Sequence, residues 1–214
     1  MADVFLPKTQ AVYGRDSRRW SHWLHCCLDI KDRVTHRDVI ANKIIAEIRV
    51  SHQSMAPPSS HPEGETVEWE CDDPKEMVVE KALLVRHVQL MTMGAMVARY
   101  YNPPGDRHEW GSALPRLRRR LTLTQYEAER EIDKAGPWVN DDKVKDRLDA
   151  VRNTYARDED APATGAKRLE DRIGEHGKAV VATLYKIWSD DAGTCLPGSG
   201  RPAQSQSWHR RWSG

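Results

Sequence analysis

Histidine and cysteine side chains, the usual protein ligands of transition metals, gather near residue 22. His22, His25, Cys26 and Cys27 fall within six residues, and His22 and Cys26 are four apart, which would place both on one face of a helix. A closed zinc site needs four ligands, and no second cluster with ligand spacing supplies the other two. We therefore predict no metal and no cofactor, and an enzyme or metal protein centred on His22, Cys26 and His87 is only a third alternative.

Two other chemical motifs fail on inspection. The segment 174–178 looks like a phosphate-binding loop, but Arg172 stands where a glycine is required and Ala179 replaces the hydroxyl that would hold magnesium. The carboxylate pairs 141–142 and 190–191 fall at expected helix ends, where such groups are normally solvated. We therefore predict no catalytic residues and a non-enzymatic role.

Arginine and tryptophan, the residues that most often anchor protein interfaces, are concentrated in a few segments. The densest basic cluster lies at 116–120, and four of the eight tryptophans fall outside the helices that we expect. Two of these four lie in connections and two lie in a polar C-terminal tail. The predicted partner-binding residues are Trp110, Trp138, Arg116, Arg118, Arg119, Arg120, Trp208, Arg210, Arg211 and Trp212.

Composition sets limits on the kind of protein. The chain has 214 residues, 33 basic and 32 acidic side chains, a net charge of +1, eight Trp and a single Phe. The net charge is +3 over residues 1–60, −7 over 61–80, +6 over 81–120, −4 over 121–160 and +3 over 161–214. Alternating blocks of this kind complement protein surfaces better than they form one field for a polyanion.

Helical spacing dominates the apolar pattern. Trp20, Trp23, Leu24, Cys27 and Leu28 follow i, i+3, i+4, i+7, i+8, which predicts a helix over 15–32. A second helix is expected after residue 35, with isoleucines at 40, 44 and 48 on one side. The stretch 51–66, rich in Pro and Ser, predicts a loop.

A long central helix is the main expectation for the middle of the chain. Asp73-Pro74 supplies start signals, and the apolar run that follows predicts a helix over 74–101. Further helices are expected at 112–121, after the capping box Thr124-Gln-Tyr-Glu127, along the stripe that begins at Val144, and between Leu169 and Ile187.

The predicted fold is therefore all-α, an irregular bundle of about six helices around the central helix 74–101, with extended termini. Residues 1–14 are expected to be an extended segment, 15–189 a single helical domain with the loop 51–66 and a linker at 158–165, and 190–214 an extended tail. No apolar stretch reaches the roughly 20 residues that a membrane-spanning helix needs. Four cysteines without a disulfide framework favour a reducing intracellular compartment, cytosol or organelle matrix, and the N-terminus does not read as a secretory signal.

Two short segments, Arg99-Tyr-Tyr-Asn-Pro and Leu121–Glu127, are similar to pieces of small helical respiratory-chain subunits. Each covers under a dozen residues, and we transfer no residue roles from them. The leading functional hypothesis is an accessory or structural subunit that docks onto other protein subunits of a large complex, such as a mitochondrial respiratory or ribosomal assembly or a virion. The alternative is a nucleic-acid-binding module that uses Arg116–Arg120 and the Trp208–Trp212 tail.

Overall fold

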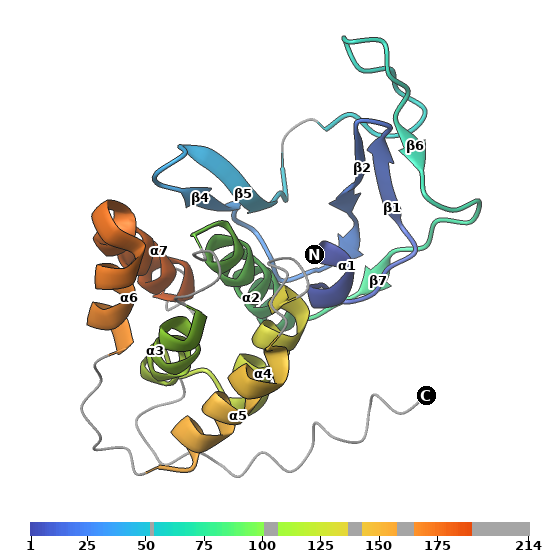
Figure 1. The fold of residues 1–214 in the computed structure, drawn as a ribbon. Helices are drawn as coiled ribbons and strands as arrows, with labels where there is room; N and C mark the ends of the chain where they lie inside the picture. Colours follow the sequence, from blue (N-terminus) through green and yellow to red (C-terminus); the bar gives the residue numbers. More distant parts are fainter. Residues whose placement is uncertain (52–53, 101–106, 137–142, 158–164, 190–214) are drawn as a thin grey trace.

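The regular structure in the first 80 residues of the chain consists mainly of short strands. The structure is a computed structural model that describes residues 1–51, 54–100, 107–136, 143–157 and 165–189, without the side chains of 107–110 and 112. After a one-turn helix α1 (Ala2–Phe5), the strands are β1 (Val12–Arg15), β2 (Arg18–Trp23), β3 (His25–Cys26), β4 (Val34–Asp38), β5 (Lys43–Ile48), β6 (Glu68–Trp69) and β7 (Met77–Val78). They form an antiparallel sheet in the order β2-β1-β6, a parallel pair β3-β7 and an antiparallel hairpin β4-β5 (Figure 1).

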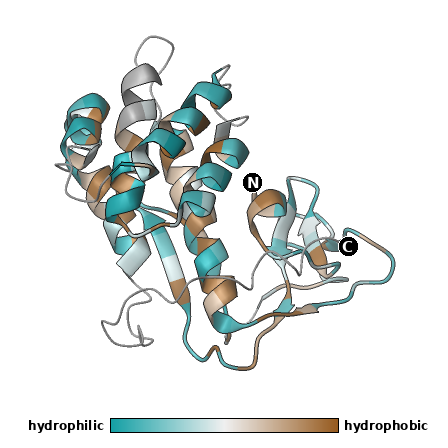
Figure 2. Cartoon of the chain, turned by 90° about the horizontal axis from the view of Figure 1, so that it is seen from below, coloured by the Kyte–Doolittle hydropathy of each residue, from teal (hydrophilic) through white to brown (hydrophobic). Residues whose placement is uncertain are grey.

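The rest of the described chain is helical. The helices are α2 (Lys81–Tyr100), α3 (Arg107–Arg120), α4 (Gln125–Ala135), α5 (Val144–Tyr155), α6 (Gly165–Ile173), a short 3-10 turn η2 (Gly174–His176) and α7 (Gly177–Ser189). The β1-β2-β6 sheet lies to one side of these helices (Figure 1). Most of the helices carry both hydrophilic and hydrophobic residues, as helices with one buried face do (Figure 2).

The prediction of an all-α fold is wrong, because three small sheets occupy the N-terminal part. No helix forms over 15–32. These residues contain the end of β1, all of β2 and all of β3. The two-residue turn at Asp16-Ser17 reverses the chain between β1 and β2. Asp and Ser are typical turn residues, and the apparent helical spacing of the aromatic residues that follow is a coincidence of a short window.

The helix predicted after residue 35 is also absent, and the hairpin β4-β5 takes its place. Valine, isoleucine and threonine pack well on a pleated surface, and the two strands are rich in them. At the turn, Asp38 Oδ1 accepts hydrogen bonds from the backbone of Ile40 and Ala41, and Asn42 adopts a left-handed conformation with φ of 50°. Asn tolerates this conformation better than most residues.

The hairpin is joined to α2 through one buried carboxylate. Asp38 is fully buried, and it accepts hydrogen bonds from Arg99 at 2.5 Å and from the Tyr100 hydroxyl at 2.7 Å. Burial alone would raise the pKa of Asp38, but these hydrogen bonds and those from the turn backbone lower it from 3.8 to about 2. The carboxylate therefore stays charged and ties β4 to the end of the helix.

The central helix exists but begins later than predicted. The start signals at Asp73-Pro74 are not used, because residues 77–78 pair with β3 as β7, and α2 begins at Lys81. Ten of its twenty residues are buried, from Leu84 to Val97. No helix among the described residues is long and apolar enough to cross a membrane.

The main hydrophobic core surrounds α2 and includes the N-terminal helix. Phe5 of α1 is 1 % exposed, and its ring lies against Gly94 of α2, so residues 1–14 are not the extended segment that the predicted fold contained. The other buried members come from α2, α3, the turn after α3, α6 and α7, among them Leu90, Met93, Met96, Leu117, Leu121, Leu169, Val180 and Leu184. A second cluster joins the hairpin to α2.

Local signals in the C-terminal half are confirmed. Thr124 accepts the Glu127 backbone N–H and Glu127 accepts that of Thr124, so the predicted capping box opens α4. Val151 of α5 is buried against Ala128 and Ile132 of α4, with Val144, Leu148 and Tyr155 packed beside it. The last predicted helix is divided into α6 and α7, because Gly174 adopts a φ of 79° that ends α6.

Candidate interaction surface

The predicted partner-binding arginines lie in α3, and some of them are engaged inside the fold. Arg118 is 2 % exposed, and its guanidinium forms two hydrogen bonds, of 2.5 and 2.7 Å, to the buried carboxylate of Glu131. Arg119 donates to the Thr154 carbonyl at 2.6 Å. Arg120 is exposed with its guanidinium 5.9 Å from the Tyr185 ring centre, and Arg116 is half-buried.

The side chains of the predicted tryptophan anchors lie outside the part of the chain that the structure describes. Trp138, Trp208, Arg210, Arg211 and Trp212 lie outside the described residues. The Trp110 side chain is also outside them, although its backbone belongs to α3. The docking role of these residues therefore stays a prediction.

The structure separates the residues of the alternative metal site. His22 stacks on Tyr13, with ring centroids 4.6 Å apart, while His87 lies in α2 and its Nδ1 contacts the Phe5 carbonyl at 2.7 Å. Burial first, and then a nearby arginine, lowers the pKa of both histidines: Arg49 for His22 and Arg130 for His87. Among the described residues, no group of three or more His, Cys, Asp or Glu side chains could hold a metal ion.

One tryptophan that the sequence pattern assigned to a helix instead stands on the surface of β2. Trp20 is 53 % exposed, although it is a large hydrophobic residue. It also has a φ of 56°, in the left-handed region that bulky L residues rarely adopt. This conformation costs roughly 1–2 kcal/mol for a non-glycine residue.

Three contacts hold Trp20 in this strained position. The register between β1 and β2 shifts between Tyr13 and Arg15, and at Gly14 an added Cβ would lie 2.4 Å from the Arg18 carbonyl oxygen. Only glycine allows so close an approach of the two strands. The Glu70 carboxylate accepts the Trp20 backbone N–H at 3.2 Å, and the Trp23 indole N–H donates to the Trp20 carbonyl at 3.0 Å.

Arg19, the residue before Trp20, also binds Glu70. Its guanidinium donates two hydrogen bonds of 2.9 and 2.5 Å to the Glu70 carboxylate, and Asp16 lies 3.7 Å away. Partial burial would raise the pKa of Glu70, but hydrogen bonds from Arg19 and Trp20 lower it. The charged carboxylate therefore fixes residues 19 and 20 together. We call Asp16, Arg18, Arg19, Trp20 and Glu68 the Trp20 surface.

A row of aromatic rings runs across the three strands of the β2-β1-β6 sheet. Tyr13 on β1 pairs with His22 on β2 and with Trp69 on β6, so the three rings share one face of the sheet. The Tyr13 and His22 rings are nearly parallel, at 5°, and Trp69 meets Tyr13 edge-on at 77° with centroids 5.2 Å apart. These ring contacts connect the three short strands through side-chain packing.

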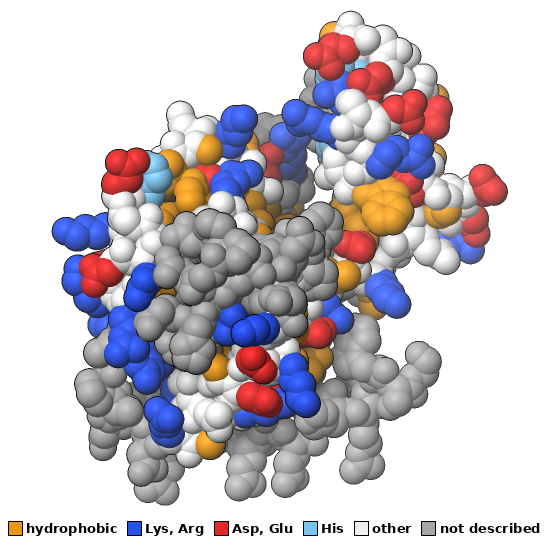
Figure 3. Space-filling model, viewed as in Figure 1, with side chains coloured by type: hydrophobic (Ala, Val, Ile, Leu, Met, Phe, Trp, Pro, Cys, Tyr) orange, Lys and Arg blue, Asp and Glu red, His pale blue; other side chains and the backbone are white. Residues whose placement is uncertain are grey.

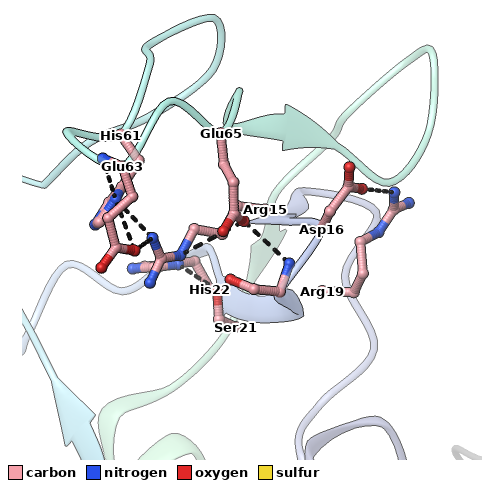
Figure 4. A network of polar contacts seen from close by, with 9 residues as sticks. Arg15, Asp16, Arg19, Ser21, His22, His61, Glu63 and Glu65 are labelled. Atoms are coloured by element: carbon pink, nitrogen blue, oxygen red, sulfur yellow. Dashed lines mark hydrogen bonds and ion pairs between the residues drawn. The ribbon is translucent and has the colours of Figure 1, made fainter.

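A network of ion pairs fastens the neighbouring loop to the β1-β2 turn (Figure 4). Arg15 Nη1 lies 2.8 Å from Glu63 and 2.6 Å from His61 Nδ1. The Ser17 backbone N–H donates to Glu65 at 3.0 Å, and this hydrogen bond lowers the pKa of the Glu65 carboxyl. The loop predicted over 51–66 is thus tied to the strands at its second half.

Acidic side chains outnumber basic ones around the Trp20 surface. Residues 12–23 and 59–73 together contain seven carboxylates and three arginines, a net charge of −4. Red acidic side chains are grouped at the upper right, over the β2-β1-β6 sheet, whereas blue basic side chains are frequent on the left, over the helices (Figure 3).

The helix predicted over 15–32 contains Trp20 and assigns it no functional role. The turn pair Asp16-Ser17, flanked by Gly14 and by the Arg-Arg-Trp run, was the available sign of a hairpin. The left-handed backbone of Trp20 has no sequence sign, since tryptophan rarely adopts it.

Comparisons with known proteins add no relative. No protein-family model matches the chain, and neither a curated protein nor a solved structure is detectably similar to it.

Proposed function

We propose that this protein is a non-enzymatic subunit that docks onto a partner protein through the Trp20 surface. The observation that carries the proposal is the strained backbone of Trp20, which presents a half-exposed indole to solvent. The hydrogen bonds of the Trp20 backbone hold this strained conformation, but the indole itself buries only about half of its surface in the isolated fold. Strained backbone conformations cluster at functional sites such as ligand clamps and switch regions.

The chemistry of the surface supports a protein partner. Tryptophan and arginine are the residues most enriched among interface hot spots, and Arg18 and Arg19 flank Trp20. The alternative, a nucleic-acid-binding module based on Arg116–Arg120, is less well supported, since Arg118 and Arg119 make their hydrogen bonds within the fold. The acidic surroundings of Trp20 would also repel a polyanion.

The compartment and the kind of assembly belong to the same proposal. Cys26, Cys27 and Cys71 form no disulfide within the part of the chain that the structure describes, which supports a reducing intracellular compartment, cytosol or organelle matrix. A complex with other protein subunits, in an organelle or a virion, suits a chain whose proposed role is docking.

The proposal is tested by the size of the species that the full-length chain forms in the cell that makes it. Tagged wild-type chain should elute from a size-exclusion column well above its own 24.5 kDa. Trp20→Ala should shift most of it to the size of the free chain, because the indole anchor is lost.

Tyr126→Ala is the matched control, since Tyr126 is a 67 % exposed aromatic residue on α4. It should leave the elution unchanged, and circular dichroism should show both variants folded. A wild-type elution at the size of the free chain, or a Trp20→Ala profile equal to that of wild type, would refute docking through this surface.

A further inference from the structure

We infer that the Trp20 surface binds an arginine side chain of the partner, stacked on the indole of Trp20 and paired with the carboxylates beside it. This inference rests on the proposed docking function and specifies the chemistry of the partner. Three observations support it: an internal arrangement of the same three groups, the carboxylates around Trp20, and the sign of the local charge.

The molecule already contains a complete arginine site of this kind. The guanidinium carbon of Arg86 on α2 lies 3.4 Å from the centre of the Trp188 ring on α7. Its Nε and Nη2 donate hydrogen bonds of 2.6 and 2.9 Å to the two carboxylate oxygens of Glu127 on α4. A planar guanidinium satisfies both neighbours at once, with its face on the indole and its edge on the carboxylate.

Trp20 has the indole and the carboxylates of such a site on the protein surface. The side chain of Asp16 is 92 % exposed, and Glu68 is exposed on β6. Asp16 lies 3.7 Å from Arg19, the residue before Trp20. Glu68 pairs across the sheet with Gly14, where an added Cβ would lie 2.9 Å from the Trp20 backbone nitrogen. Glu70 is only 12 % exposed and is occupied by Arg19 and the Trp20 backbone, so it positions the surface rather than receiving the partner.

The charge around the surface favours a cation over an anion. Arg19 is paired with Glu70, and Arg15 with Glu63. Arg18 is exposed and opposes an incoming cation, but the seven carboxylates of residues 12–23 and 59–73 exceed the three arginines there. They still exceed the basic side chains when Arg49, which acts on His22, and Lys75, which pairs with Asp73, are counted too. A cation is therefore attracted. Arginine suits the site better than lysine, because only its planar group can stack on the ring and pair with a carboxylate along its edge.

The inference is tested with three synthetic decapeptides that alternate Ser with Arg, Lys or Glu. Binding to the full-length chain is followed by NMR of the tryptophan indole N–H signals, with the Trp20 signal identified by its loss in Trp20→Phe. The Arg peptide should shift the Trp20 signal and leave the Trp188 signal in place, since Trp188 is already covered by Arg86. The Lys peptide should bind more weakly, and the Glu peptide should not bind.

A charge-matched pair of double variants tests the carboxylates. Asp16→Asn with Glu68→Gln should weaken the Arg peptide roughly fivefold, the size expected for two exposed ion pairs. Asp149→Asn with Glu175→Gln removes two exposed carboxylates from the helical part and should leave the affinity unchanged. Equal binding of the Arg and Lys peptides, an unmoved Trp20 signal, or equal losses in the two double variants would each overturn the inference.

The double variants also separate this inference from the docking proposal when they are run in the size-exclusion experiment. If Trp20→Ala releases the chain from its complex while Asp16→Asn with Glu68→Gln does not, docking stands and the arginine inference is refuted. If the Arg peptide binds at Trp20 but Trp20→Ala leaves the complex intact, the chemistry of the site stands and the proposed docking function is refuted.

Discussion

Arg86 and Trp188 are stacked, with the guanidinium carbon 3.4 Å from the centre of the indole ring. Because Arg86 also pairs with Glu127, this contact joins α2, α4 and α7. Glu127 in turn accepts the Thr124 backbone N–H at 2.8 Å and closes the start of α4. Burial would raise the pKa of Glu127, but Arg86 lowers it, so the carboxylate remains charged.

We expect Arg86→Lys to destabilise the protein, because lysine can neither stack a planar group on Trp188 nor form two hydrogen bonds to Glu127. The loss should be about 1–3 kcal/mol, the usual range for hydrogen bonds to charged groups and a partly buried cation–π contact. Urea unfolding measures it. Arg152→Lys is the control, since Arg152 is half-exposed and forms surface ion pairs, and its effect should stay below about 0.5 kcal/mol.

For the buried pair of Arg118 and Glu131, we expect one substitution to destabilise the protein and a second substitution to restore most of the lost stability. Glu131→Leu alone should cost about 3–5 kcal/mol, because it leaves a buried guanidinium without its counter-charge. Arg118→Met combined with Glu131→Leu should recover most of that loss. Arg118 Nη1 already has no hydrogen-bond partner in the described structure, so an apolar side chain there removes a cost as well as a contact. A double variant as unstable as the single one would contradict this prediction.

The stability of the protein should fall in acid through Asp38. The folded-state pKa of this carboxyl is about 2 against 3.8 when unperturbed, so the folded state takes up the proton less readily than the unfolded state. The contribution is complete above about pH 4 and is lost as the pH falls towards 2. It should amount to about 1–2 kcal/mol, since Arg99 is half-exposed.

Urea unfolding at a series of pH values between 5 and 2 measures this loss. In Asp38→Asn the decline between pH 4 and 2 should become shallower than in wild type. Tyr100→Phe removes one of the donors to Asp38 and should give an intermediate slope. A wild-type slope in the Asp38→Asn variant would show that other groups govern the acid response.

Glycine at position 20 should separate stability from docking. Trp20→Gly and Trp20→Ala both remove the indole, but only glycine adopts a φ of 56° without strain. Trp20→Gly should therefore be the more stable variant by about 1 kcal/mol, visible as a higher thermal midpoint by roughly 2–4 °C. Both should lose docking equally. If Trp20→Ala is as stable as Trp20→Gly, the left-handed conformation of this residue is not strained.

Local sequence signals predicted the helical half of the molecule well. The box from Thr124 to Glu127 and the stripe from Val144 to Tyr155 depend on neighbouring residues within one helix, and both are confirmed. Capping and periodicity act over three to eleven residues, which is the range that a single sequence displays directly.

The strands were missed because their stability comes from distant partners. Tyr13 packs against Trp69, 56 positions later, and the lengths of β3, β6 and β7 are only two residues each. Such short strands have no alternation to detect, and their pairing depends on tertiary contacts. The same holds for Trp20, whose exposure and strain follow from Gly14 and Glu70 rather than from its own neighbours.

The placement of α1 has a consequence for how the chain is made. The Phe5 carbonyl is contacted by His87 and the Val4 carbonyl accepts a hydrogen bond from Arg130, so these partners leave the ribosome about 80 and 125 residues later. At typical synthesis rates of roughly 5–20 residues per second, Phe5 waits about 6–25 s before its full binding site exists. Val4 and Phe5 thus reach their final place only after α2 and α4 have been synthesised, although both residues precede these helices in the chain.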